Sequence, residues 1–192
     1  GNIALVTKLH ANLPDSCAAL SLNHFCASGL SSIGIAANAC ALGQNEVVLA
    51  GGVESMSQVP FLADKASYYS DTSLPLERRF LPVAVSADLL ATRFDISRTE
   101  LNEFTCLSHQ RAAHAENYQQ SRIAVMDSNG AVMAQEDECI RPQTSLESLA
   151  ALAPAFEEIA KPYRDTLAGR TIEYRHSMAN APPMVDGAAL AM

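Results

Sequence analysis

Residues 18–52, AALSLNHFCASGLSSIGIAANACALGQNEVVLAGG, decide the fold class. Residues 18–25 form a short apolar run without Gly or Pro, which predicts a buried strand. Residues 28–42 carry small and aliphatic side chains on nearly every face and precede Gly43, which predicts an enclosed helix with a glycine C-cap. Residues 46–50 predict a second buried strand that ends at two glycines. This order favours a right-handed crossover between parallel strands, and therefore an α/β fold with a mixed, mostly parallel sheet packed by helices.

Shorter elements are predicted around this core. Residues 2–12 show near-helical apolar spacing before Pro14, which indicates a short helix. Capping-box patterns at residues 97–100 and 144–147 predict a helix reaching about residue 119 and a second helix ending before Pro154. Asn129-Gly130 predicts a hairpin turn. We expect residues 1–59 to form the first part of an α/β domain, 60–169 an inserted α-rich loop region, and 170–192 a truncated return to that domain.

The composition excludes several classes of protein. With 192 residues, of which 48% are hydrophobic and 18% charged, the chain can bury a core, which excludes disordered and fibrous proteins. Thirteen Lys and Arg against 21 Asp and Glu give a net charge of −8, which opposes binding to nucleic acid or anionic membranes. The sequence has no apolar run long enough for a membrane span and starts without a signal peptide pattern, so we expect a cytoplasmic protein. The apolar ending at residues 187–192 suggests a partial chain.

Cysteine and histidine spacing argues against disulfides and metal sites. The five cysteines form no CxxC pair, and their odd number in an apolar chain suits free thiols in a reducing compartment. His109 and His114 lie five residues apart, which on a helix points them in different directions, so no metal is expected. Cys17 and Cys40 are interpreted as small buried hydrophobic residues.

Cys26 is the candidate nucleophile. It lies where a predicted strand meets a predicted helix, before the small residues Ala27, Ser28 and Gly29. A thiol in the first turn of a helix is near the positive end of the helix dipole and unpaired N–H groups, which favour thiolate and can support an oxyanion. The alternative is a small buried hydrophobic residue. His24 shares the strand face with Cys26 and is either a base or a structural histidine, the interpretation we favour.

Two further features allow a structural and a functional interpretation. The stretch GGVE at residues 51–54 lacks a phosphate-loop pattern, so it is interpreted as a turn, with Glu54 as a carboxylate that accepts backbone N–H groups. Arg78 and Arg79 are either solvated surface residues or contacts to a phosphate-bearing ligand.

Several segments resemble the thiolase family. NHFCASG at residues 23–29 is similar to the active-site cysteine segment of thiolases, and LAGGVESMS at 49–57 to the glycine-rich strand end that follows it. Further similar segments occur in family order: SADLLAT at 86–92, RPQTSLE at 141–147, LAPAF at 152–156 and NAPPMVDGAA at 180–189. The pair VLAGGVESMS and ADLLAT is most similar to bacterial acyl-CoA thiolases of fatty-acid β-oxidation.

The resemblance implies a 3-ketoacyl-CoA thiolase, which transfers an acyl group to CoA through a covalent acyl-cysteine at the position of Cys26. CoA is a substrate, no other cofactor is implied, and the partners are acyl-CoA and CoA. The inserted region would cover CoA, and family members assemble as homodimers or tetramers. The family's catalytic histidine and second cysteine lie in Gly-His-Pro and Cys-x-Gly settings, which these 192 residues lack. We therefore expect this chain alone to be inactive.

Two departures affect the implied substrate wall. Pro182 stands where the family commonly has a serine that contacts the pantetheine arm, and Met178 replaces a small residue of the same wall. The alternatives are a biosynthetic, acetoacetyl-CoA-forming thiolase, a ketoacyl synthase of the same fold, and a non-catalytic or truncated CoA-binding protein.

Overall fold

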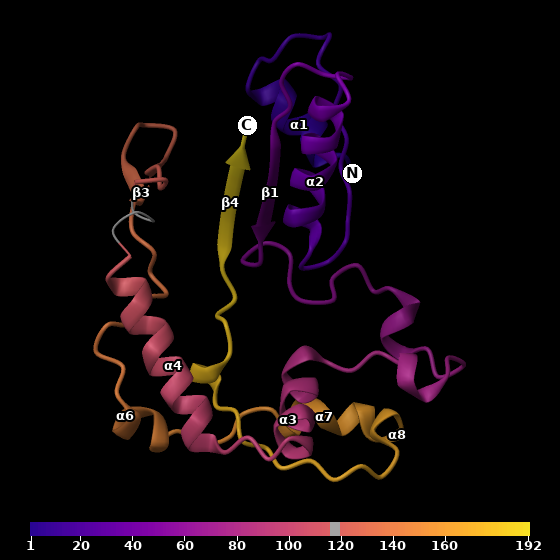
Figure 1. Cartoon of the computed structure of the whole chain (residues 1–192), viewed down its shortest axis with the longest axis vertical. Coiled ribbons are helices and arrows are strands. Elements are labelled where there is room, and N and C mark those ends of the chain that lie inside the picture. The colour runs from indigo at the N-terminus through magenta and orange to yellow at the C-terminus, as the bar shows by residue number, and fades with distance from the viewer. Residues whose placement is uncertain (116–119) are drawn as a thin grey trace. The chain divides into compact units, whose positions relative to one another are not determined.

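The computed structural model describes residues 1–115 and 120–192, which form two compact units (Figure 1). The first unit combines Gly1–Phe61 with Met184–Met192, and the second consists of Leu62–Pro183. The second unit therefore interrupts the sequence of the first. Residues 170–183, which the sequence analysis grouped with the returning segment, pack within the second unit instead, because Arg175 and His176 donate backbone N–H groups to Asp88.

The first unit contains a two-stranded antiparallel sheet. Strand β1 (Ala50–Ser55) pairs with β4 (Asp186–Ala191) in a register that places Ala50 opposite Ala191 and Ser55 opposite Asp186. Gly51 is required at its position, because a Cβ atom there would lie 2.6 Å from the carbonyl oxygen of Ala189. The two glycines that were predicted to form a turn therefore lie inside a strand that begins at Ala50.

Two helices accompany this sheet. Helix α1 (Ile3–His10) begins at Asn2, whose side chain accepts the N–H of Leu5, and confirms the predicted short helix. Helix α2 (Ser28–Ala41) packs beside β1 and is followed by Gly43 in the left-handed region at φ +68°. The predicted helix and its glycine C-cap are thus confirmed.

The predicted first strand and the parallel crossover are wrong for the part of the chain that the structure describes. Residues 18–25 form no strand: Ala19 and Ser21 contact the start of α1, and the N–H groups of His24 and Phe25 donate to side chains of Ser28 and Asn23. Asn2 donates its side-chain amide to the carbonyl of Ala19 at 3.1 Å, and Ser21 Oγ accepts the N–H of Ala4 at 3.1 Å. Without that strand no crossover forms, and both sheets in the described residues are antiparallel.

The burial predicted for this region is also wrong. Helix α2 has no buried residue, and Leu30 is 78% exposed. Cys17 and Cys40 are exposed rather than buried, although all five cysteines are free as expected. Apolar periodicity identifies an apolar face but not the element that covers it.

The second unit is built mainly from short helices. Its helical elements are η1 (Ser67–Ser70), η2 (Leu76–Arg78), α3 (Val83–Arg93), α4 (Arg98–Ala113), α6 (Leu146–Ala150), α7 (Glu157–Ala160), η3 (Lys161–Tyr163), α8 (Arg164–Leu167) and η4 (Met178–Asn180). A core cluster brings together one buried residue each from α3, α7 and α8, which are Val85, Ala160 and Leu167. Partly buried residues of flanking segments pack against this cluster: Leu81, Ile172 and Tyr174. The Phe80 ring makes edge contacts with Tyr69 of η1 and with Tyr163 of η3. These contacts attach the segment before α3 to η3.

Local sequence signals for this unit are largely confirmed. Ser97 and Glu100 form the capping box that starts α4, which ends at Ala113. Residues 116–119 at the predicted end of this helix lie outside the described part of the chain. The second box is shifted by one residue, because Ser145 caps α6 and pairs with Ser148. The predicted hairpin joins β2 (Val125–Met126) to β3 (Val132–Ala134) through Gly130 at φ +80°.

Candidate functional site

Cys26 lies in a tight turn directly before α2. The carbonyl of His24 accepts the N–H of Ala27 at 3.1 Å, and the carbonyl of Phe25 accepts the N–H of Ser28 at 3.0 Å. Phe25 has φ +48°, in the left-handed region that non-glycine residues seldom adopt, so the backbone turns sharply just before the cysteine. The thiol of Cys26 is free and exposed.

The start of α2 offers N–H groups beside this thiol. Within the described residues, no acceptor contacts the backbone N–H groups of Gly29 and Leu30, the second and third residues of the helix. These groups are at the positive end of a 14-residue helix. A thiolate or an oxyanion near Cys26 would therefore be stabilised electrostatically.

His24 is held by the helix rather than aimed at the sulfur. Its Nδ1 lies 2.8 Å from Ser31 Oγ, and its backbone N–H donates to Ser28 Oγ at 2.8 Å. This supports the structural interpretation of His24. Among the described residues, no backbone N–H donates to the carboxylate of Glu54. The carboxylate that accepts a backbone N–H at this end of the sheet is that of Asp186, from Ser57 at 2.9 Å.

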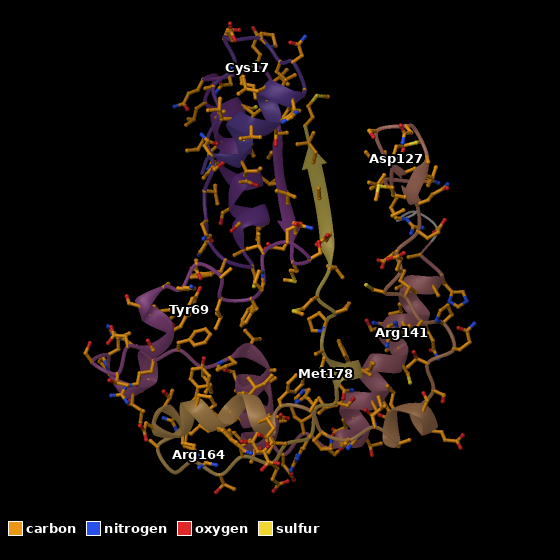
Figure 2. All side chains as sticks on the ribbon, turned by 180° about the vertical axis from the view of Figure 1, so that it is seen from behind. Cys17, Tyr69, Asp127, Arg141, Arg164 and Met178 are labelled. Atoms are coloured by element: carbon orange, nitrogen blue, oxygen red, sulfur yellow. The ribbon has the colours of Figure 1, made fainter. Side chains whose placement is uncertain are left out.

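Met178 and Pro182 belong to the second unit, and Cys26 belongs to the first. Met178 begins the η4 turn and is 69% exposed, and Pro182 is exposed two residues after the turn. Figure 2 shows Arg141 and Met178 in the part of the second unit that contains α4. Met178 is followed by Ala179, which lines a cavity of that unit.

This cavity, which we call the arginine cavity, has a volume of about 410 Å³. It combines a cation, hydroxyl and amide groups and apolar side chains, from His109, Arg141, Gln143, Thr144, Ser148, Leu149, Leu152 and Ala179. His109 Nδ1 accepts the backbone N–H of Arg141 at 3.2 Å, which fixes the ring against the loop. Sequence reasoning missed these residues as site residues, although Arg141 opens the segment RPQTSLE that supports the family resemblance.

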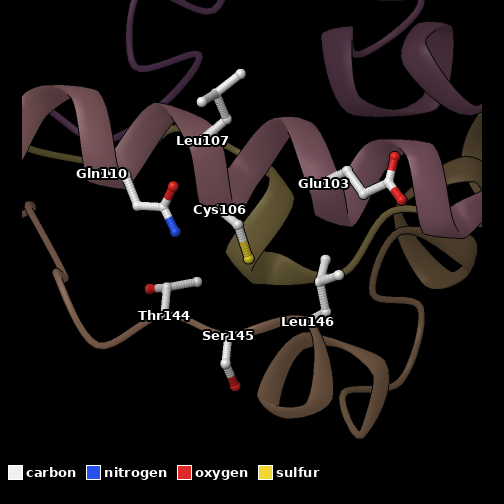
Figure 3. Close-up of a pocket in the computed structure, with 7 residues that line it drawn as sticks. All are labelled: Glu103, Cys106, Leu107, Gln110, Thr144, Ser145 and Leu146. Atoms are coloured by element: carbon white, nitrogen blue, oxygen red, sulfur yellow. The ribbon is translucent and has the colours of Figure 1, made fainter.

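A second cavity of about 460 Å³ lies between α4 and the start of α6 (Figure 3). The thiol of Cys106 points into it beside Leu146 and Ser145. Cys106 is in the middle of α4 and is only 7% exposed, so it has neither the free helix N–H groups nor the access of Cys26. Its position favours a packing role.

The two neighbouring arginines have different environments. Arg79 donates from Nε to the carbonyl of Leu74 at 2.9 Å and from its guanidinium to the carbonyl of Thr72. It therefore holds its own loop together. Arg78 is exposed, so of the pair it is the one whose charge is available to a ligand.

The described residues contain neither of two features that other classes of protein would require. No cluster of three or more metal-ligating side chains occurs among them. None of the helices there is both long enough and apolar enough to cross a bilayer.

An exposed thiol at the start of a helix, in a unit that also contains a sheet, is an arrangement compatible with a cysteine nucleophile. The sequence profile described as "Thiolase, N-terminal domain" matches residues 2–161. The chain therefore belongs to the thiolase family, and both the family and its α/β fold class are confirmed.

Relatives and solved structures agree with this assignment. The chain is 38% identical over 162 residues to a 3-ketoacyl-CoA thiolase of Aliivibrio fischeri, covering 81% of this chain and 42% of the relative. It is 36% identical over 176 residues to a beta-ketoadipyl-CoA thiolase of Pseudomonas putida, covering 80% and 44%. The dimeric peroxisomal thiolase of Saccharomyces cerevisiae is similar at a TM-score of 0.74 and 28% identity, covering 96% and 45%. The chain thus spans less than half the length of these relatives.

Proposed function

We propose that this chain is the nucleophile-bearing part of a 3-ketoacyl-CoA thiolase of fatty-acid β-oxidation, with Cys26 as the residue that carries the acyl group. The observation that carries the proposal is the exposed thiol of Cys26 in the turn before α2, beside the open N–H groups of Gly29 and Leu30. The similarity to a 3-ketoacyl-CoA thiolase of Aliivibrio fischeri supports the substrate class.

The proposed reaction has two transfers. The Cys26 thiolate attacks the C3 carbonyl carbon of a 3-ketoacyl-CoA, the C2–C3 bond breaks, and its electron pair stays on C2 of acetyl-CoA, which takes up a proton. The thiol of a free CoA then loses its proton and attacks the acyl-cysteine, so that a shortened acyl-CoA leaves and the thiolate of Cys26 returns. CoA is a substrate here, and the reaction takes no metal or redox cofactor.

The proton transfers need groups besides Cys26. Among its described neighbours, His24 is engaged with Ser31, and the family resemblance assigns these transfers to Gly-His-Pro and Cys-x-Gly segments. Groups that act as one catalytic unit lose nearly all rate enhancement when one is missing. Turnover by these 192 residues alone is therefore not expected.

We assign the nucleotide end of CoA to the arginine cavity. Arg141 supplies a fixed positive charge for phosphate, which matters in a chain of net charge −8, and the hydroxyls of Thr144 and Ser148 supply further hydrogen bonds. Leu149 and Leu152 provide the apolar surface that a base needs. The pantetheine arm would then pass Met178 and Pro182, which adjoin the cavity residue Ala179 in sequence.

The proposed assembly is a homodimer in the cytoplasm, with a tetramer as the higher state. The support is the dimeric yeast thiolase among the similar structures. Sedimentation of the full-length gene product would distinguish the two states.

The test of the acyl-cysteine is intact-mass and peptide mass spectrometry of the full-length gene product after incubation with acetoacetyl-CoA, without free CoA. We expect an acetyl group on the peptide that contains Cys26, and its absence in Cys26→Ala. Cys40→Ala is the matched control, because Cys40 is also an exposed free thiol but lies in the last turn of α2. Acetylation that persists in Cys26→Ala, or that is lost in Cys40→Ala, would overturn the proposal.

A further inference from the structure

The η4 turn is attached to α4 through a single side-chain amide. Asn180 Oδ1 accepts both the backbone N–H and the Oγ hydroxyl of Ser177, each at 2.8 Å. Its Nδ2 donates to Asn102 Oδ1 at 3.1 Å and to Thr105 Oγ1 at 3.0 Å, both on α4. The two acceptor and two donor positions of this amide are therefore all occupied within the protein.

The contacts of Asn180 are buried. Asn102 is 4% exposed, Thr105 is 8% exposed, and Ser177 is fully buried. A buried polar network in which every group is paired holds one arrangement, because any displacement leaves a donor or acceptor unpaired in a medium of low dielectric constant. These directional hydrogen bonds thus fix both the orientation of the η4 turn and its distance from α4.

The same helix also lines the arginine cavity. His109 lines that cavity from α4, four residues, or about 6 Å of helix rise, after Thr105. Ala179 lines it from η4, directly before Asn180. The amide of Asn180 therefore joins the wall that contains Ala179 to the helix that carries His109.

We propose that Asn180 is a positioning residue, which with Asn102 and Thr105 sets the width of the arginine cavity and so the affinity for CoA. The inference rests on the proposed CoA site and deepens it: the ligand contacts the walls, and the amide sets the spacing of the walls. Asn180 itself makes no contact with the ligand in this proposal.

The chain offers a matched pair of variants. Thr105 Oγ1 donates to the carbonyl of Leu101 and accepts from Asn180, whereas Thr92 Oγ1 donates to the carbonyl of Asp88 and accepts the N–H of Glu173 at 2.9 Å. Each threonine thus donates within its helix and accepts a hydrogen bond from the segment of residues 170–183, and Thr92 Oγ1 also lies 3.4 Å from the carbonyl oxygen of Glu173. Thr105→Val and Thr92→Val remove equivalent bonds, but Thr92 is not among the residues that line the cavity or hold η4.

The experiment is titration calorimetry of CoA into the full-length gene product and its variants. We expect Thr105→Val to weaken CoA binding about fivefold, the equivalent of one net hydrogen bond, with Thr105→Ser within about twofold of the original chain. Thr92→Val is expected to bind CoA as the original chain does, although both valine variants lower the unfolding midpoint. Asn102→Ala removes the other acceptor of Asn180 and takes the place of Thr105→Val if that variant does not fold.

Each outcome decides between the two proposals. Equal CoA affinity in Thr105→Val, Thr92→Val and the original chain, with a loss in Arg141→Ala, overturns the positioning role and leaves the CoA site standing. Equal losses of CoA affinity in both valine variants overturn the positioning role as well, since they show that lowered stability alone weakens CoA binding. Full affinity in Arg141→Ala, or no CoA binding by the original chain, refutes the CoA site itself.

Discussion

The carboxylate of Asp88 should be among the most important polar groups for the stability of the second unit. Asp88 is on α3, is 0% exposed, and accepts the backbone N–H groups of Arg175 and His176 at 2.9 and 3.0 Å. It also lies 2.6 Å from Nδ1 of the His176 ring. One side chain thus satisfies three donors of a segment 87 and 88 residues away in sequence.

The size of the effect follows from the groups left unpaired. Asp88→Ala removes the acceptor of two backbone donors and one ring donor, each costing about 1–3 kcal/mol when buried without a partner. Because Arg175 and His176 are only half-buried, water can reach some of these donors, and we expect the lower part of the summed range, a loss of about 3–5 kcal/mol. Asp88→Asn retains an oxygen for these donors, but it places an NH₂ group where Asp88 Oδ2 is buried without a hydrogen-bond partner. That variant should lose only about 1–2 kcal/mol.

Urea unfolding followed by circular dichroism measures these differences. Asp95→Ala is the control, because Asp95 also contacts this segment, at 3.2 Å from Arg175, but its side chain is 94% exposed and an exposed ion pair contributes little. The denaturant slope should stay the same in all variants, so that the midpoints report stability. A loss below about 1 kcal/mol in Asp88→Ala, or equal losses in Asp88→Ala and Asp88→Asn, would refute the reasoning.

Three further predictions follow from single contacts. Limiting iodoacetamide should alkylate Cys26 faster than Cys40, which is also exposed, because Cys26 precedes a helix and Cys40 lies at the end of one; equal rates would contradict this. The hydroxyl and N–H of Ser57 donate to Asp186 and lower the pKa of its carboxyl group. The stabilisation from these bonds is therefore fully present at pH values above the ordinary Asp pKa and is lost as the pH falls through the lowered pKa. A carboxyl NMR titration should show the Asp186 midpoint rising in Ser57→Ala. Arg79→Ala should speed proteolysis within residues 72–79, because it removes the hydrogen bonds from Arg79 to the carbonyls of Leu74 and Thr72. An unchanged cleavage rate would show that Arg79 does not hold this loop together.

Elements that depend on short sequence spacing were predictable. The box of Ser97 and Glu100 starts α4 as expected, because both partners lie within one helical turn. The hairpin at Gly130 also forms as predicted, since its Asp127 accepts the N–H groups of Asn129 and Ala131 within five residues. These signals are local, so they survive without knowledge of the tertiary fold.

Contacts between distant segments were not predictable in the same way. The arginine cavity brings His109 of α4 to Arg141, 32 residues later, and nothing in the spacing of a single histidine and a single arginine indicates this. The strand partner of β1 is equally remote, since Ser55 pairs with Asp186. Pairing direction depends on the path of the chain between strands, and the sequence pattern of one strand does not contain that path.

The burial of α4 shows how a distant partner decides which face of a helix points inward. The apolar pattern of this helix includes Phe104, yet Phe104 is 74% exposed, whereas Asn102 and Thr105 are almost fully buried. The reason is that Asn180 donates to both, so the polar face gains paired hydrogen bonds by packing against η4. Asn102, Thr105 and His109 recur three and four residues apart, which places them on one face. A buried polar stripe of this spacing on a helix can therefore mark a face that a side-chain amide joins to another segment, and in this chain that face leads directly to the arginine cavity.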